Sequence, residues 1–330
     1  MEKPNPLPNE FEFVRRYLEP LVLDHEAAAY LKDDCAVFGV NSGQEIVISV
    51  DTLIADLHFF KKDPPKQIAQ KILRVNLSDL ASSGAKPKFY FLAMSLPSTI
   101  GIDWIEQFCL GLEADQAKFG ISLLGGDTTS TPGPLSLTAT VIGEVPKGKA
   151  IRRGGASEDE DVYLTGVIGD AALALSLIKT KGLDTVSKNF SVLLDRYRLP
   201  QPRTVLASNL RQIASACIDV SDGLAADLGH ICKTSGIAAD INISCLPISK
   251  TARILLREDI KNWQTIINGG DDFELLFTAQ PHFSKAIEKL SKEKKIRINR
   301  IGKTTKGSSV RFFDPKGKLF IVNKSGWRHF

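Results

Sequence analysis

The stretch ACIDVSDGLAADLGHIC, residues 216–232, places an apolar run directly before a helical stripe. The run Ala216–Val220 has the length and polar boundaries of a buried strand. Ser221 and Asp222 follow it and are residue types that favour the start of a helix. The residues after them recur at the spacing of one helix face: Leu224, Leu228, Ile231 and Cys232. This strand–turn–helix pattern predicts a fold that combines helices with a sheet.

The same alternation continues along the rest of the chain. The other expected strands are Ile46–Val50, Phe89–Leu96, Leu135–Ile142, Val162–Thr165 and Leu275–Ala279. Two further apolar stripes with helical spacing lie within residues 105–112 and 283–290. Alternating strands and helices favour an α/β or α+β architecture over an all-α or all-β one.

The length of 330 residues suggests about two domains. The segment PKGKAIRRGGASEDED, Pro146–Asp161, is polar and rich in charge, and it separates two expected strands. Such a segment is typical of a boundary. We therefore expect an N-terminal domain over residues 1–148 and a C-terminal domain over residues 149–330.

The composition narrows the class of protein. Lys and Arg number 42 and Asp and Glu 38, and the net charge of +4 is too small to suggest a nucleic-acid or membrane partner. The five cysteines contain no CxxC pair, which argues against a disulfide scaffold or a zinc site. The N-terminus is polar, and the apolar stretch Phe89–Leu96 is too short to span a bilayer. We expect a cytoplasmic enzyme.

Aspartates recur beside apolar runs and glycines, where an ionised carboxylate is costly unless it is paired or binds a metal. They are Asp33, Asp34, Asp51, Asp79, Asp127, Asp219, Asp222, Asp271 and Asp272. Any one of them can be explained as the cap of the next helix. The whole series favours several Mg²⁺ ions that carry substrate phosphates, because Mg²⁺ prefers oxygen ligands.

Other groups could complete a phosphate site. The segments GGDTT (125–129) and SDG (221–223) offer flexible backbone beside hydroxyls and a carboxylate. Arg152 and Arg153 follow the next strand and are either phosphate ligands or surface residues. The segment Gly143–Ala150 matches GxxxxGK but lacks the hydroxyl residue that a P-loop needs for Mg²⁺.

Eight motifs occur in an order that resembles the thiamine-monophosphate kinase family, within the superfamily of aminoimidazole ribonucleotide synthetase. They are DDCAVF (33–38), SVDTLIADLHF (49–59), NLSDLASSGAKP (76–87), GGDTTS (125–130), GEVPKGKAIRRGGA (143–156), IDVSDGLAADLGHI (218–231), GGDDFELLF (269–277) and GWRHF (326–330). The similarity extends from about Asp33 to Trp327. GGDTT, VSDGL and NLSDLAxxGA are typical of the superfamily, and DTLxxxxHF and the terminal GWxHF indicate the thiamine branch.

The resemblance implies a two-domain aminoimidazole ribonucleotide synthetase-like fold. It implies ATP-dependent phosphorylation of thiamine monophosphate to thiamine diphosphate with several Mg²⁺ ions. It also implies a homodimer in which the N-terminal sheets pair, with ATP in a cleft between subunit halves. The N-terminal domain would bind ATP and metal and form the dimer, and the C-terminal α/β domain would complete the site.

Residue roles follow from the same resemblance. The implied metal ligands are Asp34, Ser49, Val50, Asp51, Asp79, Asp127, Asp219 and Asp222. The implied ATP contacts are Gly126, Asp127, Arg153 and Ser221, and the implied contacts to thiamine monophosphate are His58, Asp271 and Trp327. Asp271 replaces the glutamate that is usual in the family, and Lys32 replaces a glycine.

The expected chemistry is direct in-line transfer of the γ-phosphoryl group, with no catalytic residue beyond those that position metal and phosphate. Two alternatives remain open from the sequence. One is a related ATP-dependent synthetase of the same superfamily, and the other is a non-catalytic nucleotide-binding regulator. His58 and Trp327 also have ordinary structural interpretations, as a buried histidine and as a residue that caps the core.

Overall fold

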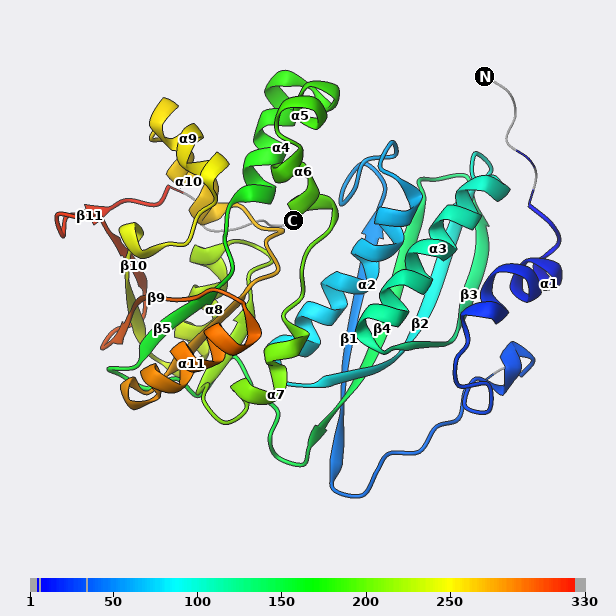
Figure 1. Ribbon diagram of the computed structural model, residues 1–330, viewed down its shortest axis with the longest axis horizontal. Coiled ribbons are helices and arrows are strands. Elements are labelled where there is room, and N and C mark those ends of the chain that lie inside the picture. Colours follow the sequence, from blue (N-terminus) through cyan, green and yellow to red (C-terminus); the bar gives the residue numbers. More distant parts are fainter. Residues whose placement is uncertain (1–4, 6, 34, 324–330) are drawn as a thin grey trace. The chain divides into compact units, whose positions relative to one another are not determined.

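The computed structural model describes residues 5, 7–33 and 35–323 (Figure 1). The chain divides into two compact units, which we describe separately. Unit 1 comprises residues 1–80 and 85–148, and unit 2 comprises residues 81–84 and 149–330. In the part of the chain that the structure describes, no helix is both long enough and apolar enough to cross a membrane.

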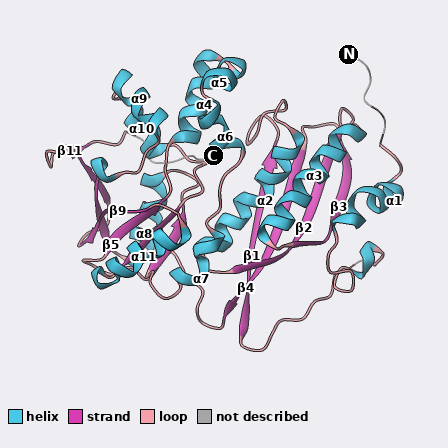
Figure 2. Ribbon diagram, viewed as in Figure 1, coloured by secondary structure: helices cyan, strands magenta, loops and turns pink. Residues whose placement is uncertain are grey.

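Unit 1 is built on a four-stranded sheet with the order β1-β4-β2-β3. Its strands are β1 (Gln44–Ile54), β2 (Lys86–Pro97), β3 (Ser122–Thr131) and β4 (Ser136–Pro146). β4 is antiparallel to β1 and to β2, whereas β3 runs parallel to β2 at the edge. The long helices α2 (Pro65–Ser82) and α3 (Ile102–Phe119) cover one face of this sheet (Figure 2).

The core of unit 1 lies between that face and the two helices. Ile72 and Leu73 of α2 and Leu112 of α3 are completely buried there, with Tyr90 of β2. A buried ion pair also joins the helices, because Arg74 Nε lies 2.6 Å from Asp115 Oδ2. We call the opposite side of the sheet the open face, since neither long helix covers it.

A segment near the N-terminus lies against part of the open face. Short helices α1 (Glu10–Phe13), η1 (Val14–Leu18), η2 (Glu19–Leu21) and η3 (Ala29–Leu31) precede the sheet. Phe38 packs on Phe89 of β2 with ring centroids 5.2 Å apart. The β1 part of the open face remains uncovered, since Ile48 and Val50 are each 58% exposed.

Unit 2 contains a seven-stranded sheet with the order β11-β10-β7-β9-β5-β8-β6. Its strands are β5 (Asp161–Thr165), β6 (Ala216–Asp219), β7 (Ala238–Asn242), β8 (Leu275–Ala279), β9 (Ile298–Thr305), β10 (Val310–Phe313) and β11 (Leu319–Phe320). Its helices are α4 (Asp170–Lys181), α5 (Leu183–Asn189), α6 (Ser191–Arg198), η4 (Thr204–Leu206), α7 (Ala207–Leu210), α8 (Leu224–Ser235), η5 (Ile243–Cys245), α9 (Lys250–Glu258), α10 (Asn262–Asn268), η6 (Pro281–Phe283) and α11 (Ser284–Lys294).

Alternate residues of the central strands of unit 2 enter two separate cores. Val162 and Leu164 of β5 pack with residues of α4, α8 and α10 on one face. Tyr163 packs with Ile287 and Leu290 of α11 on the other. The sheet is therefore covered on both faces, which explains why β5, β6 and β8 are buried along their whole length.

The mixed α/β class predicted from the sequence is confirmed, and a strand occurs at each predicted run. β1, β2 and β4 are longer than predicted at one or both ends, whereas β8 has the predicted bounds. GGDTT was expected to form a flexible phosphate-binding segment, but it lies inside β3. We did not predict β3, β7 or β10, because polar and charged residues interrupt their apolar patterns, nor the two-residue strand β11.

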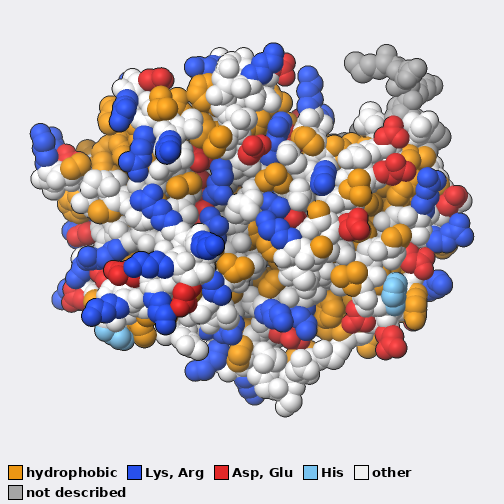
Figure 3. All heavy atoms as spheres, viewed as in Figure 1, with side chains coloured by type: hydrophobic (Ala, Val, Ile, Leu, Met, Phe, Trp, Pro, Cys, Tyr) orange, Lys and Arg blue, Asp and Glu red, His pale blue; other side chains and the backbone are white. Residues whose placement is uncertain are grey.

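Charged side chains are mixed on the visible surface. In the view of Figure 3, Lys and Arg lie among Asp and Glu and do not gather in one patch. This distribution agrees with the small net charge of +4.

Candidate active site

The structure of unit 1 brings three of the predicted metal ligands together on the helix-covered side of the sheet. Ser49, Asp51 and the buried Leu53 occupy every second position of β1. All three therefore lie on the same face of the sheet and point toward α2. Asp79 lies on α2, and its Oδ2 accepts a hydrogen bond of 2.5 Å from Ser49 Oγ. Asp79 also forms a side-chain hydrogen bond with Asp51.

The electrostatics of this cluster suit a cation. Burial, together with the negative charge of Asp79, raises the pKa of Asp51 from 3.8 to about 7. Two carboxylates at this separation repel each other when both are ionised, and a divalent cation between them would remove that repulsion. The donor set of carboxylate and hydroxyl oxygens is one that Mg²⁺ prefers. The cluster therefore fits a Mg²⁺ ion.

Val50 and Asp127 do not join this cluster within one copy of unit 1. Val50 points to the open face, so only its backbone carbonyl can serve as a ligand. Asp127 also belongs to the open face, because it pairs across the sheet with open-face residues. From the β1 edge to the β3 edge, this row is Thr52, Thr138, Ala93 and Asp127. Three strand spacings separate the two ends of that row, or about 14 Å.

A cavity of about 480 Å³ borders the segment that contains Asp127. Its walls include Gly126, Asp127 and Phe91 together with Asp33 and Cys35. Gly126 is packed so closely on β2 that an added Cβ would overlap the carbonyl oxygen of Leu92. The cavity places Asp33 and Cys35 beside GGDTT, and the predicted ligand Asp34 lies outside the described residues.

His58 follows β1 in a tight loop. Its Nδ1 accepts a hydrogen bond of 3.0 Å from the amide of Ile54, and its carbonyl accepts one of 2.9 Å from Lys71 Nζ. With Nδ1 acting as an acceptor, a neutral imidazole carries its proton on Nε2. His58 is thus held through both its side chain and its backbone carbonyl.

In unit 2, the predicted metal and ATP residues lie at one end of β6. Asp219 is the last residue of the strand and is 2% exposed. Ser221, Asp222 and Gly223 form the turn into α8, and their amides all donate to Asp227 Oδ2 at 3.0–3.1 Å. The SDG turn is therefore held by one buried carboxylate.

Asp227 was not predicted as a site residue. Burial is the main cause that raises its pKa to about 7, and the charge of Asp222 raises it further, while the three amide hydrogen bonds lower it. Ligand atoms of Asp222, Asp227 and His230 lie within 4.8 Å of one another. The position of Asp227 in the first turn of α8, four residues after Gly223, is a signal in the sequence that could have indicated it.

Asp271, the predicted substrate contact, lies beside the SDG turn. Its amide donates to the carbonyl of Ser221 at 2.9 Å, and its φ of +63° is in the left-handed region. Gly270 is required here, because a Cβ would overlap the carbonyl oxygen of Ser221. The structure therefore brings the predicted substrate residue next to a predicted ATP residue.

Arg153 is the one remaining predicted residue that the structure describes. Arg153 is exposed in the segment after β4, where the neighbouring carbonyl of Arg152 accepts from the amide of Cys217 at 3.0 Å. Trp327, like Asp34, lies outside the described residues.

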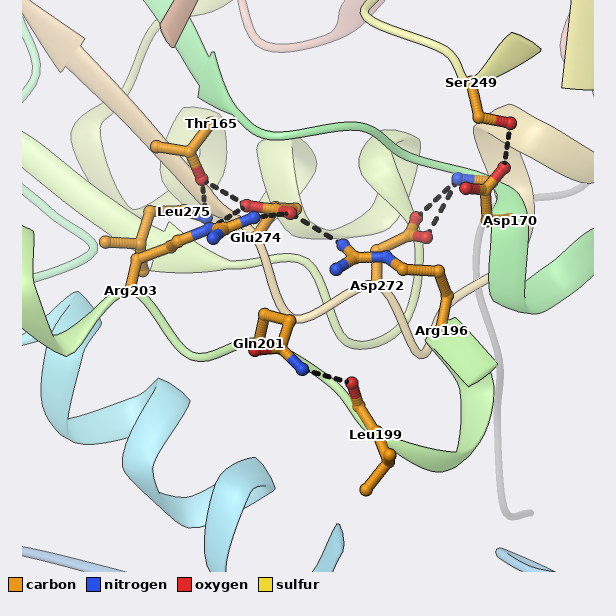
Figure 4. A network of polar contacts seen from close by, with 11 residues as sticks. Thr165, Asp170, Arg196, Leu199, Gln201, Arg203, Ser249, Asp272, Glu274 and Leu275 are labelled. Carbon is orange, nitrogen blue, oxygen red and sulfur yellow. Dashed lines mark hydrogen bonds and ion pairs between the residues drawn. The ribbon is translucent and has the colours of Figure 1, made fainter. Parts of the chain in front are cut away.

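Asp272, the residue after Asp271, belongs to a polar network that the sequence did not reveal (Figure 4). Its charged members are Asp170, Arg196, Arg203, Asp272 and Glu274. Glu274 stands in the apolar run of FELLF, and a glutamate in such a run is a signal that could have identified it.

Two family models match the chain. The model described as AIR synthase related protein, N-terminal domain, matches residues 32–145, and the corresponding C-terminal domain model matches residues 157–315. The two matches fall on unit 1 and unit 2 respectively.

Curated relatives match nearly the whole chain. A protein named thiamine-monophosphate kinase from Caulobacter vibrioides is 37% identical over 98% of this chain and 91% of its own length. The proteins of the same name from Escherichia coli K12 and Bacillus subtilis are 35% and 32% identical, over 97% and 98% of this chain and 98% and 99% of their own lengths.

Solved structures show the same fold. A thiamine-monophosphate kinase from Stenotrophomonas maltophilia has a TM-score of 0.84 and 37% identity, and the match covers 94% of this chain and 98% of that one. The hydrogenase maturation protein HypE in complex with ATP has a TM-score of 0.78 at 16% identity, over 98% and 96% of the two chains, and shows the fold alone. With relatives this similar over almost its full length, the chain belongs to the thiamine-monophosphate kinase family.

Proposed function

We propose that this protein transfers the γ-phosphoryl group of ATP to thiamine monophosphate and so forms thiamine diphosphate. Family membership supports this assignment, and a more distant structural neighbour carries AMPPCP and TMP. The structural observation that carries the proposal is the cluster of Ser49, Asp51 and Asp79, which has the oxygen ligands that a metal–phosphate site requires.

The proposed Mg²⁺ ligands are the acids, the hydroxyl and the backbone carbonyl predicted from the sequence. They are Ser49, Asp51, Asp79 and Asp127 of unit 1, Asp219 and Asp222 of unit 2, together with Asp34 and the backbone of Val50. When bound, Mg²⁺ neutralises charge on the two phosphates and aligns them. The number of ions stays a prediction.

The chain's own residues bind and orient the reactants. The acceptor is a phosphate oxygen that is already anionic, so transfer requires no strong general base. Arg153 would contact ATP through its guanidinium, and Ser221 and Gly126 would contact it at points where the backbone is tightly fixed. His58, Asp271 and Trp327 would hold thiamine monophosphate. Their contribution is positioning, which supplies most of the rate in phosphoryl transfer.

The open face of unit 1 supports a homodimer. Asp127 and the Asp51–Asp79 pair lie on opposite faces and at opposite edges of the sheet, so one copy does not place all three acids around one phosphate group. Ile48 and Val50 expose apolar surface on the same open face, as a face that pairs with a second copy would. We propose that two copies pair through their N-terminal sheets, with the β3 edge of one copy beside the β1 edge of the other, so that the partner subunit's Asp127 completes the site.

An assay of product formation tests the function. The purified protein is incubated with Mg-ATP and thiamine monophosphate, and thiamine diphosphate is detected after oxidation to its fluorescent thiochrome. We expect product that requires ATP, Mg²⁺ and acceptor together. ATP binding without any product would indicate the regulator, and ATP hydrolysis without thiamine diphosphate would indicate a sister synthetase. The expected cytoplasmic location stays a prediction.

A further inference from the structure

Glu274 lies at the centre of the polar network that contains Asp272. Its side chain is fully buried, and the residue stands directly before β8 in the chain. Arg196 Nη2 donates to Oε1 at 2.7 Å, and Arg203 donates through Nε to Oε2 at 2.6 Å and through Nη2 to Oε1. Thr165 Oγ1 donates to Oε2 at 2.7 Å. Figure 4 shows these groups converging on the carboxylate from separate segments of unit 2.

This arrangement holds Glu274 in one position. Two guanidinium groups compensate one buried carboxylate, and the planar guanidinium of Arg203 binds it through two nitrogens. The backbone also encloses the carboxylate, because a Cβ on Gly166 would overlap it. Thr165 Oγ1 in turn accepts from the amide of Leu275 at 2.8 Å, which fixes the residue after Glu274.

A second anchor lies two residues earlier. Both carboxylate oxygens of Asp272 accept from the amide of Gly169, at 2.8 and 3.0 Å. Arg196 lies between Asp272 and Glu274 (Figure 4). Asp272 is 3% exposed, so neither anchor can move without disturbing the interior of unit 2.

The loop that contains these anchors, residues 271–274, has a strained backbone. Asp271 and Phe273 have φ values of +63° and +51°, which non-glycine residues seldom adopt. Such conformations cost free energy and persist only where the surroundings determine them. The buried side chains of Asp272 and Glu274 hold the loop in this conformation.

The same loop is hydrogen-bonded to the SDG turn and to Val220, the residue before that turn. The amide of Asp271 donates to Ser221, and the amide of Phe273 donates to Val220, each at 2.9 Å. The amide of Val220 donates back to the carbonyl of Glu274 at 2.8 Å. The location of Asp271 relative to Ser221 therefore depends on where Glu274 is held.

We propose that Glu274, held by Arg196 and Arg203, is a positioning residue that sets the location of Asp271. The proposal rests on the proposed function, in which Asp271 contacts thiamine monophosphate and Ser221 contacts ATP. Glu274 touches neither reactant and acts through the loop. Asp227 independently holds the SDG turn through three amides, so loosening Glu274 displaces Asp271 and leaves the ATP contact in place.

Two variants test the anchor. Thr165→Val keeps the shape of the side chain and removes the hydroxyl that donates to Glu274, and Glu274→Gln removes the charge that the arginines compensate. The matched control is Glu160→Gln at the other end of β8, where a carboxylate that is 1% exposed accepts from Ser215 and Gln280 at 2.7 and 3.0 Å. Thr165→Val keeps the test possible if Glu274→Gln does not fold.

Two measurements are made on each purified variant. The first is KM for thiamine monophosphate and for ATP, and we expect the former to rise about tenfold in the two anchor variants while the latter changes less than about twofold. The second is hydrogen exchange at the amides of Asp271 and Phe273, which we expect to become about tenfold faster in the anchor variants and to stay unchanged in Glu160→Gln.

The outcomes separate the anchor from the function. An equal rise of both KM values, or unchanged exchange at Asp271 and Phe273, would overturn the positioning role. An effect of Glu160→Gln as large as that of Thr165→Val would also overturn it, since the cause would then be general destabilisation. If the wild-type protein forms no thiamine diphosphate, the proposed function fails, while faster exchange confined to the anchor variants still supports the anchor.

Discussion

Asp51 on β1 and Asp79 on α2 face each other as two hydrogen-bonded carboxyl groups on the helix-covered side of the unit 1 sheet. Ser49 donates to the second of these carboxyls and completes a cluster of oxygen ligands. Acids placed this close are costly without a cation, and a metal–phosphate enzyme needs such an arrangement.

The first prediction concerns pH. The folded protein keeps a proton on Asp51 up to about pH 7, whereas an unperturbed aspartate loses it near 3.8. The native state therefore binds more protons than the unfolded state between these values. The stability that Asp51 contributes is fully present below 3.8 and is lost as the pH rises through 7.

Thermal unfolding in metal-free buffer checks this prediction. As the pH rises from about 5 to about 8, we expect the melting temperature of the wild-type protein to fall further than that of Asp51→Asn. Added Mg²⁺ at the higher pH should raise the melting temperature of the wild-type protein more than that of the variant. If the two proteins follow the same pH curve with and without Mg²⁺, the carboxyl pair has no such linkage.

The second prediction concerns the acids themselves. Asp79→Asn should lower kcat/KM by roughly a hundredfold or more, because it removes a carboxylate that would hold the Mg²⁺ needed to neutralise and align the reacting phosphates. The control is Asp103→Asn, which makes the same change at an exposed position in the first turn of α3. Near-normal turnover of Asp79→Asn at saturating Mg²⁺ would contradict the carboxylate–metal scheme.

The third prediction concerns the homodimer. If the partner subunit's Asp127 completes the site, Asp79→Asn and Asp127→Asn chains are each inactive alone but restore one intact site when they pair. Random pairing then recovers about a quarter of wild-type activity, since half of the dimers are mixed and each has one working site. Co-expression with two affinity tags provides the measurement. Absence of any recovery in purified mixed dimers would place Asp127 in its own subunit's site.

The fourth prediction concerns stability. Arg74 and Asp115 form an ion pair whose side chains are only 5% and 1% exposed. Arg74→Met leaves the Asp115 carboxylate buried without its charged partner and should lower the free energy of unfolding by about 3–5 kcal/mol. Urea denaturation checks the value. The exposed pair Lys289–Glu293 serves as the comparison, since a change at an exposed pair costs less than about 1 kcal/mol.

In unit 1, the sequence indicated which acids lie together on β1 and α2 but not the orientation of Asp127. Asp51 and Asp79 were expected to serve as metal ligands, and the structure places them together because alternation along β1 directs Asp51 toward α2. The opposite orientation of Asp127 could not be predicted, because it depends on the pairing register across three strands and on the bulge between Tyr90 and Phe91.

The supporting residues of unit 2 were harder to predict. Asp227 and Glu274 lie among residues with ordinary helix and strand patterns, and their roles depend on distant partners. Arg203 is 71 residues away from Glu274 in the chain, so no local signal links them. Sequence patterns indicate where a carboxylate lies on a helix or strand, but not which distant arginine side chain binds it.

The ratio of products in a single reaction tests whether the γ-phosphoryl group passes directly from ATP to thiamine monophosphate. Wild-type protein is mixed with Mg-ATP and limiting thiamine monophosphate, and ADP and thiamine diphosphate are both quantified by phosphorus NMR. Direct transfer predicts equal amounts of the two products and no ADP without the acceptor. ADP in excess of thiamine diphosphate, or ADP with no thiamine diphosphate at all, would contradict the account.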